Sequence, residues 1–134
     1  MRTLIAEDDF IARKYLKEIM SPYGDCDVVV DGEEAVQAFR LAWQEKKPYD
    51  LICLDIMMPK MDGQEALKQI REIEKHIGVK GSAEVKVIMI TALSDPKNVF
   101  EAYYKGGATS YIVKPVDRAK LVEELRSFNL IQGE

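Results

Sequence analysis

The sequence predicts a three-layer α/β fold in which helices cover both faces of a parallel sheet. Short apolar segments alternate with longer segments whose apolar residues recur at helical spacing, and this alternation occurs five times. Strand–helix–strand crossovers are right-handed and bury a parallel sheet between two helical layers. Five such units favour an open, doubly wound sheet over a closed barrel, which needs eight.

The composition is that of one soluble globular domain. We expect the 134 residues to form a single domain, with a core over about 2–128 and a short tail at 129–134. The net charge of −4 argues against direct nucleic-acid binding by this domain. No apolar run is long enough to span a membrane, and the first residues lead straight into acids, unlike a signal peptide.

The first half of the chain predicts two strands and two helices. A short apolar strand over 3–6 runs directly into Glu7, Asp8 and Asp9. A helical stripe follows and ends at Pro22 and Gly24, before a second strand over 26–30. The next helix begins after the Asp31–Gly32 turn. The apolar faces of the two helices consist of Ile11, Tyr15, Leu16 and Ile19, and of Ala35, Val36, Phe39, Ala42 and Trp43.

The segment 51–63 holds the strand around which the chain is organised. Its first four residues are apolar, Asp55 follows them, and Pro59 stops the run, which is typical of a buried parallel strand. Ligands of open α/β sheets bind just beyond the carboxyl ends of the strands. Asp55 is therefore either a reactive group or a structural cap, and its neighbours decide between the two.

The second half predicts three helices and two more strands. Asp62 and Glu65 have the spacing of a helix N-cap and its partner, Pro96 suits a first helical turn after Asp95, and Asp117 caps a last helix. We expect strands over 85–90 and 109–113, and a helix that Gly106 and Gly107 end. The apolar faces of the first and last of these helices are Leu67, Ile70, Ile73 and Ile77, and Leu121, Val122, Leu125 and Phe128.

These strand ends place five polar residues at one edge of the sheet: Glu7, Asp8, Asp55, Thr91 and Lys114. Converging carboxylates repel one another unless a cation is present, and Mg²⁺ prefers such oxygen ligands. A threonine hydroxyl and a lysine can hold phosphoryl oxygens. The set predicts a phosphoryl-transfer site with Asp55 as nucleophile. Taken singly, each residue has a structural alternative, such as the acids favoured at a helix N-terminus.

Four short motifs carry a family resemblance. Glu7–Asp8, Asp55 with the segment 58–63, Thr91–Ala92 and the segment 111–115 together resemble the signature set of response-regulator receiver domains. The resemblance extends from about Arg2 to Phe128. It implies a CheY-like (βα)5 fold with strand order 2-1-3-4-5, and a phosphorylation-activated signalling switch of a two-component system rather than an enzyme acting on a separate substrate.

The resemblance also implies residue roles. Asp55 would accept a phosphoryl group from a sensor histidine kinase or a histidine phosphotransfer protein. Mg²⁺ (or Mn²⁺) would be held by Asp8, Asp55 and the backbone carbonyl of Met57, with Glu7 acting largely through a water. Thr91 and Lys114 would bind phosphoryl oxygens, and Thr91 with Tyr111 would form the switch pair. The Lys114–Pro115 peptide bond would be cis.

The same resemblance implies partners and location. The surface formed by the helices expected over 95–106 and 117–128 would dock a downstream protein or a second copy of the chain. Phe100, Tyr103 and Tyr104 cannot all face inward there, so some apolar surface is expected. The protein would be cytoplasmic, of bacterial or archaeal type.

Two departures from the family pattern bear on function. Met57 and Leu93 occupy the positions that tune dephosphorylation, and neither apolar side chain can orient an attacking water, so slow loss of the phosphoryl group is expected. Extra length falls within 76–86, where we expect a longer loop or an extended helix. His76 is the sole histidine and is interpreted as a solvated bystander.

Three other functions compete with the receiver interpretation. A phosphohydrolase of the haloacid-dehalogenase type needs an acid two residues after its nucleophile, where this chain has Met57. A flavodoxin-like nucleotide binder needs a phosphate-binding loop after the first strand, where Glu7, Asp8 and Asp9 would repel phosphate. A degenerate receiver that folds but is never phosphorylated is the strongest rival, and the complete residue set argues against it.

Overall fold

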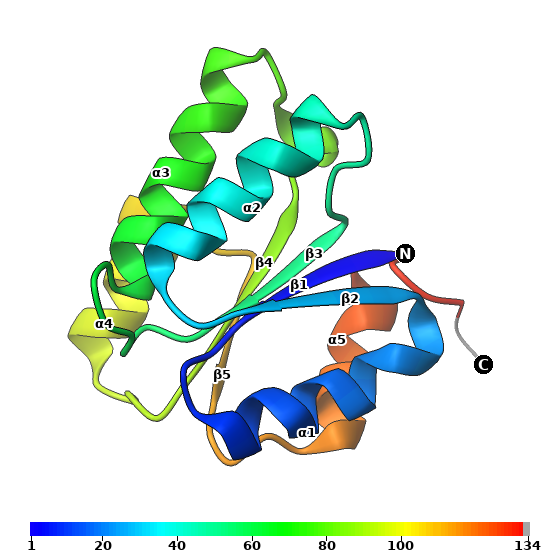
Figure 1. Cartoon of the computed structure of the whole chain (residues 1–134). Coiled ribbons are helices and arrows are strands. Elements are labelled where there is room, and N and C mark those ends of the chain that lie inside the picture. Colours follow the sequence, from blue (N-terminus) through cyan, green and yellow to red (C-terminus); the bar gives the residue numbers. More distant parts are fainter. Residues whose placement is uncertain (133–134) are drawn as a thin grey trace.

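A computed structural model describes residues 1–132 and confirms the predicted α/β fold (Figure 1). Five parallel strands form one sheet in the order β2-β1-β3-β4-β5, as the family resemblance implied. The strands are β1 (Arg2–Ala6), β2 (Asp25–Val29), β3 (Leu51–Leu54), β4 (Lys86–Thr91) and β5 (Ser110–Val113). Residues 133 and 134, within the tail expected at 129–134, lie outside the described part of the chain.

Five α-helices connect or follow the strands, and an aspartate begins each one. The helices are α1 (Phe10–Met20), α2 (Gly32–Gln44), α3 (Gly63–His76), α4 (Pro96–Phe100) and α5 (Arg118–Ser127). The side chains of Asp9, Asp31, Asp62, Asp95 and Asp117 each accept a hydrogen bond from a backbone N–H of the first turn. None of the helices in residues 1–132 combines the length and the apolar character that a bilayer crossing requires.

Shorter helical turns complete the connections. The 3₁₀ turn η1 (Ser21–Tyr23) follows α1, and the 3₁₀ turn η2 (Gly81–Ala83) precedes β4. The π-helical segment η3 (Glu101–Gly106) continues α4. Gly107 ends η3 in the left-handed conformation, with φ of 76°. The helix expected up to Gly106 is therefore present, but its second half is wound more widely than an α-helix.

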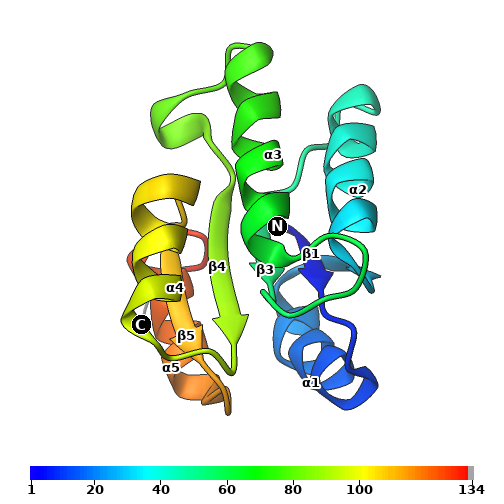
Figure 2. The same cartoon turned by 90° about the vertical axis from the view of Figure 1, so that its left-hand side faces the viewer.

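Two apolar layers hold the helices on opposite faces of the sheet (Figures 1 and 2). Alternate strand residues face opposite layers, so that Ile52 and Leu54 pack beneath α2 and α3 while Leu51 and Cys53 pack against α1 and α5. Leu130 and Ile131, beyond α5, pack against the second layer as well. Continuous apolar strands are what a sheet covered on both sides requires.

The segment between α3 and β4 is a loop, which was one of the two outcomes expected for the extra length. It contains η2 and spans 77–85. Ile77, expected on the buried face of the helix, is 46% exposed because it follows the last residue of α3 and serves as its C-cap. The prediction that Ile77 is a core residue is therefore wrong.

Candidate functional site

The carboxyl ends of the strands converge at the lower left of Figure 1. Glu7 follows β1, Asp55 follows β3, Thr91 ends β4 and Lys114 follows β5. Backbone hydrogen bonds extend the sheet past the strands at these points: Asp55 N donates to Ala6 O at 3.0 Å, and Lys114 N donates to Thr91 O at 2.8 Å. The side chains that follow the strands are thus held on a rigid edge.

Three carboxylates meet at this edge. Oxygens of Glu7, Asp8 and Asp55 all lie within 4.8 Å of one another. Glu7 is 1% exposed and Asp55 6% exposed, whereas Asp8 faces solvent. Lys114 bridges the two buried acids, because its Nζ donates to Glu7 Oε1 and, at 3.0 Å, to Asp55 Oδ2. The lysine is the only cation paired with either buried acid in residues 1–132.

Burial and charge act in opposite directions on these groups. Burial, and to a lesser extent the nearby Asp55 charge, raise the pKa of Glu7 to about 6, although the hydrogen bond from Lys114 opposes them. Burial alone would lower the pKa of Lys114, but its hydrogen bonds to Glu7 and Asp55 outweigh burial and raise it. Lys114 therefore stays charged, but its single positive charge does not balance the three carboxylates at this edge.

The loop after Asp55 holds the carboxylate in place. Met57 N donates to Asp55 Oδ1 at 3.3 Å, and the Met57 side chain is 60% exposed. The loop returns to begin α3 at Gly63, whose N–H donates to Ile56 O at 2.8 Å. A Cβ at Gly63 would lie 2.0 Å from the Asp55 carbonyl oxygen, so only glycine fits there.

A second set of contacts connects Thr91 with Tyr111. Thr91 is fully buried, and its Oγ1 accepts a hydrogen bond from Leu93 N at 3.4 Å. The Tyr111 hydroxyl donates to Leu93 O at 2.7 Å. Both residues of the expected switch pair therefore contact the backbone of Leu93, in the loop that leads to α4. The half-buried Leu93 side chain packs against the core, and the Lys114–Pro115 peptide bond is cis.

Two contributors were missed in the sequence. Arg13 Nη1 donates to the carbonyl oxygens of Glu7 and Asp8, at 3.0 and 3.3 Å, and so braces the acidic loop. Gln64 is buried, and its Nε2 donates to Asn98 O at 2.9 Å, which joins the start of α3 to α4. Arg13 could have been predicted to support the acidic loop, because it is a basic residue one helical turn after three consecutive acids. The sequence carries no comparable signal for Gln64.

The donor set fits a hard divalent cation. Three carboxylates supply oxygen ligands only, and Asp8 opens the cluster to solvent, which suits an ion that keeps several waters. Within residues 1–132, no other group of three potential ligands comes as close together. The same edge combines a buried carboxylate, a lysine and a threonine hydroxyl, which is the chemistry of phosphoryl transfer to an acid.

Residues 3–126 match the family described as the response regulator receiver domain. The chemotaxis protein CheY of Treponema pallidum is 35% identical over 128 residues, which are 94% of this chain and 81% of that protein. The match thus extends over nearly all of this chain and about four fifths of that protein.

Two further proteins that are similar to this chain differ in their molecular context. The structure of the CheX–CheY–BeF3–Mg+2 complex from Borrelia burgdorferi contains a chain that is 34% identical, with a TM-score of 0.82, and the match covers 98% of this chain and 90% of that one. The hybrid signal transduction histidine kinase I of Dictyostelium discoideum is 30% identical over 127 residues, or 94% of this chain and 7% of the kinase. Similar domains thus occur alone and within much longer kinases.

Proposed function

Because the chain belongs to the response regulator receiver domain family, we propose that it is a phosphorylation-activated switch whose Asp55 accepts the phosphoryl group. Family membership makes it a two-component signalling domain rather than a classical enzyme. The proposal rests on one observation, the pairing of the Asp55 carboxylate with Lys114 beside Glu7 and Asp8.

The transfer requires the chain to position one acid and to neutralise its charge. An oxygen of Asp55 attacks the phosphorus of a phosphohistidine, the P–N bond breaks, and the histidine leaves with the electron pair and takes up a proton. Lys114 and Thr91 are the groups near Asp55 that can then hold the phosphoryl oxygens. The aspartyl phosphate adds negative charge where three carboxylates already meet.

Mg²⁺ or Mn²⁺ would be held by Asp8, Asp55 and the Met57 carbonyl, with Glu7 acting through a water. Bound there, the ion would neutralise the charge that gathers on the transferred phosphoryl group. Arg13 would keep the backbone of the acidic loop in position, because it holds the carbonyl oxygens of both Glu7 and Asp8.

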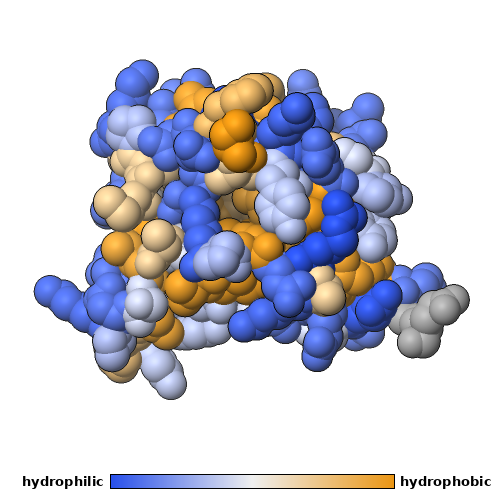
Figure 3. Space-filling model, turned by 90° about the horizontal axis from the view of Figure 1, so that it is seen from below, coloured by the Kyte–Doolittle hydropathy of each residue, from blue (hydrophilic) through white to orange (hydrophobic). Residues whose placement is uncertain are grey.

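The phosphodonor would dock on α1. The first turns of this helix lie beside Asp8 and expose Phe10 and Ile11, which are 63% and 70% accessible. Between α1 and the loop before α5 lies a cavity of about 610 Å³ lined by Tyr15, Lys114 and Pro115 among others. Apolar side chains gather across the middle of this face in Figure 3. A sensor histidine kinase or a histidine phosphotransfer protein is the expected partner, which the kinase relative supports.

The output surface would be α4, η3 and α5, where a downstream protein or a second copy would bind. Leu93 connects Thr91 with Tyr111 and precedes α4, so movement of Thr91 toward a phosphoryl group would disturb the Tyr111 hydrogen bond. Tyr103 lies 6.4 Å from Tyr111 between ring centres, and Tyr104 is 77% exposed. The proposed location is the cytoplasm, where such kinases present their phosphohistidine.

Incubation with acetyl phosphate, followed by intact-mass analysis, tests the proposal. The expected result is a single phosphoryl adduct in Mg²⁺ and none in EDTA. Asp55→Asn is expected to abolish the adduct, whereas Asp25→Asn, an exposed change of the same type, is expected to retain it. An adduct that persists in Asp55→Asn would refute the assignment. No adduct in the wild type under either condition would identify a degenerate receiver.

A further inference from the structure

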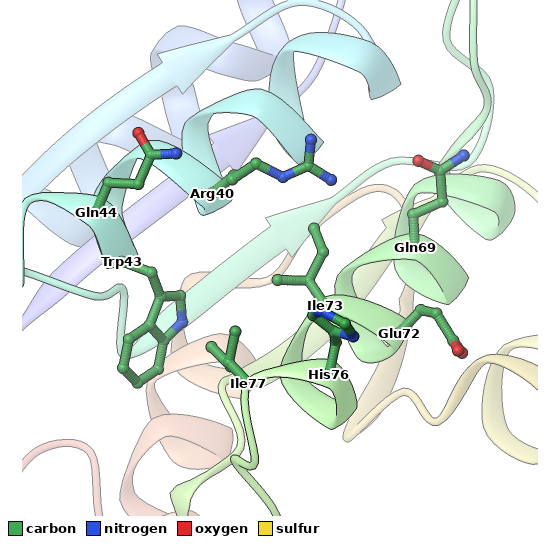
Figure 4. Close-up of a pocket in the computed structure, with 8 residues that line it drawn as sticks. All are labelled: Arg40, Trp43, Gln44, Gln69, Glu72, Ile73, His76 and Ile77. Atoms are coloured by element: carbon green, nitrogen blue, oxygen red, sulfur yellow. The ribbon is translucent and has the colours of Figure 1, made fainter.

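A cavity of about 780 Å³ lies between α2 and α3, away from the phosphoryl site (Figure 4). Both helices begin at the edge where Asp55 lies and run toward the opposite edge, and the cavity lies near their C-terminal ends. Its apolar part consists of Trp43, Ile73 and Ile77. The volume falls in the range that small-molecule sites occupy, and none of these residues has a part in the phosphorylation proposal.

The indole N–H of Trp43 lacks an acceptor. Its Nε1 is buried and has no hydrogen-bond partner within residues 1–132. Figure 4 shows the nitrogen edge of the ring turned toward Ile77. Ile77 is half exposed, follows the last residue of α3 and precedes Gly78, whose φ is 84°. A buried donor without a partner is unfavourable, and a small rotation of the Ile77 side chain would open it to a ligand.

The positively charged side chain of Arg40 lies at the rim of the same cavity. Arg40 lies three residues before Trp43 on α2, so both side chains leave the same face of the helix. In Figure 4 the guanidinium of Arg40 extends over the cavity, toward Ile73. None of the ion pairs formed by the described residues includes Arg40. Glu72 also lines the cavity, but its carboxylate points away from Arg40.

We propose that this cavity binds a small amphipathic carboxylate, an aromatic or aliphatic monocarboxylic acid. The apolar body of the ligand packs on Trp43, Ile73 and Ile77. Its carboxylate pairs with the guanidinium of Arg40, whose planar donors match that group, and accepts the indole N–H. The site is independent of phosphorylation and is tested on the unmodified protein.

The single tryptophan makes the test direct, because one indole resonance and one emission spectrum report on the cavity. The probes are 4-phenylbutyrate and its neutral amide, titrated into the full chain. The carboxylate is expected to shift the indole N–H resonance downfield and saturably, and to bind about tenfold more tightly than the amide.

Variants separate charge recognition from packing. Arg40→Gln is expected to bring the affinity for the carboxylate down to that for the amide, while Arg126→Gln, which removes an exposed arginine on α5, leaves the tenfold preference intact. Trp43→Phe keeps the apolar floor and removes the donor, and calorimetry is expected to show weaker binding of both probes, with the larger loss for the charged carboxylate.

Three results would overturn the proposal. One is that neither probe binds saturably, and another is equal affinity for the acid and the amide in the wild type. The third is a tryptophan signal that changes with protein concentration alone, which would show that the cavity is part of an interface between two copies of the chain.

Discussion

At the scale of single residues, ionisation of the buried Glu7 makes the folded chain less stable. Its carboxylate is 1% exposed and close to Asp55, and hydrogen bonds from Lys114 and from the Asp9 backbone N–H only partly offset the cost of ionising it. Burial raises its pKa from 4.5 to about 6. The folded chain therefore holds the Glu7 proton more tightly than the unfolded chain does. It loses this contribution to stability as the pH rises through 6.

Stability against pH measures this cost. Between pH 4 and pH 7 in EDTA, the free energy of unfolding of Glu7→Gln is expected to rise by about 2 kcal/mol relative to the wild type. The reason is that glutamine has no proton to lose. Urea unfolding at several pH values checks this, with the exposed Glu123→Gln as a control whose profile should follow the wild type. Parallel profiles for Glu7→Gln and the wild type would contradict the account.

We expect Met57 and Leu93 to govern how long a phosphoryl group persists on Asp55. Met57 is exposed beside Asp55, and the side chain of Leu93 is half buried against the core. Neither can hydrogen-bond a water, so slow hydrolysis is expected. The double change Met57→Asn with Leu93→Glu is expected to speed decay of the adduct at least about tenfold, since polar groups that orient a nucleophile contribute on this scale. Mass analysis over time after removal of the donor checks this, and an unchanged rate would contradict it.

At the scale of elements, the long loop between α3 and β4 is held by one buried ion pair. Glu74 on α3 is 1% exposed, accepts a hydrogen bond from Arg71 at 2.7 Å and another from Val85 N at 2.6 Å. Arg71 also donates to the carbonyl oxygens of Val85 and Gly107. One pair thus joins α3, the start of β4 and the end of η3.

Removal of one partner should release the loop. Glu74→Ala is expected to lower the free energy of unfolding by about 3 kcal/mol, because it leaves Arg71 without its carboxylate and Val85 N without an acceptor. Hydrogen exchange should accelerate over 77–85. The neighbouring Glu72→Ala, at an exposed position, should change stability by no more than about 0.5 kcal/mol. Equal effects of the two substitutions would show that the pair does not hold the loop.

Sequence patterns located most of these elements because their signals are local. The aspartates that cap α3, α4 and α5 were predicted from the neighbouring sequence, since a cap depends on residues within one turn. Ile77 was wrongly predicted to be buried because the helical spacing of apolar residues continues beyond the last residue of α3. In the structure the Ile77 side chain is half exposed. The π-helical winding of η3, which packs against α3, is not indicated by any local pattern.

At the scale of the whole molecule, the site was largely predictable because parallel strands align their ends. Once the strands were placed, Glu7, Asp55, Thr91 and Lys114 had to lie at one edge. The bracing by Arg13 and the contact between Gln64 and Asn98 could not be predicted, since each depends on how a helix packs against its neighbours. The connection from Thr91 through Leu93 to Tyr111 likewise emerges only in three dimensions.

We propose that charge at Asp55 reaches the α4 surface through Leu93. Amide NMR spectra with and without beryllofluoride and Mg²⁺ test it most directly, because this mimic adds the charge without turnover. In the wild type we expect shifts at Leu93, Tyr111 and residues of α4 and η3, and in Asp55→Asn we expect none. Shifts confined to the acidic loops and to residues next to Asp55, or identical shifts in Asp55→Asn, would contradict the claim.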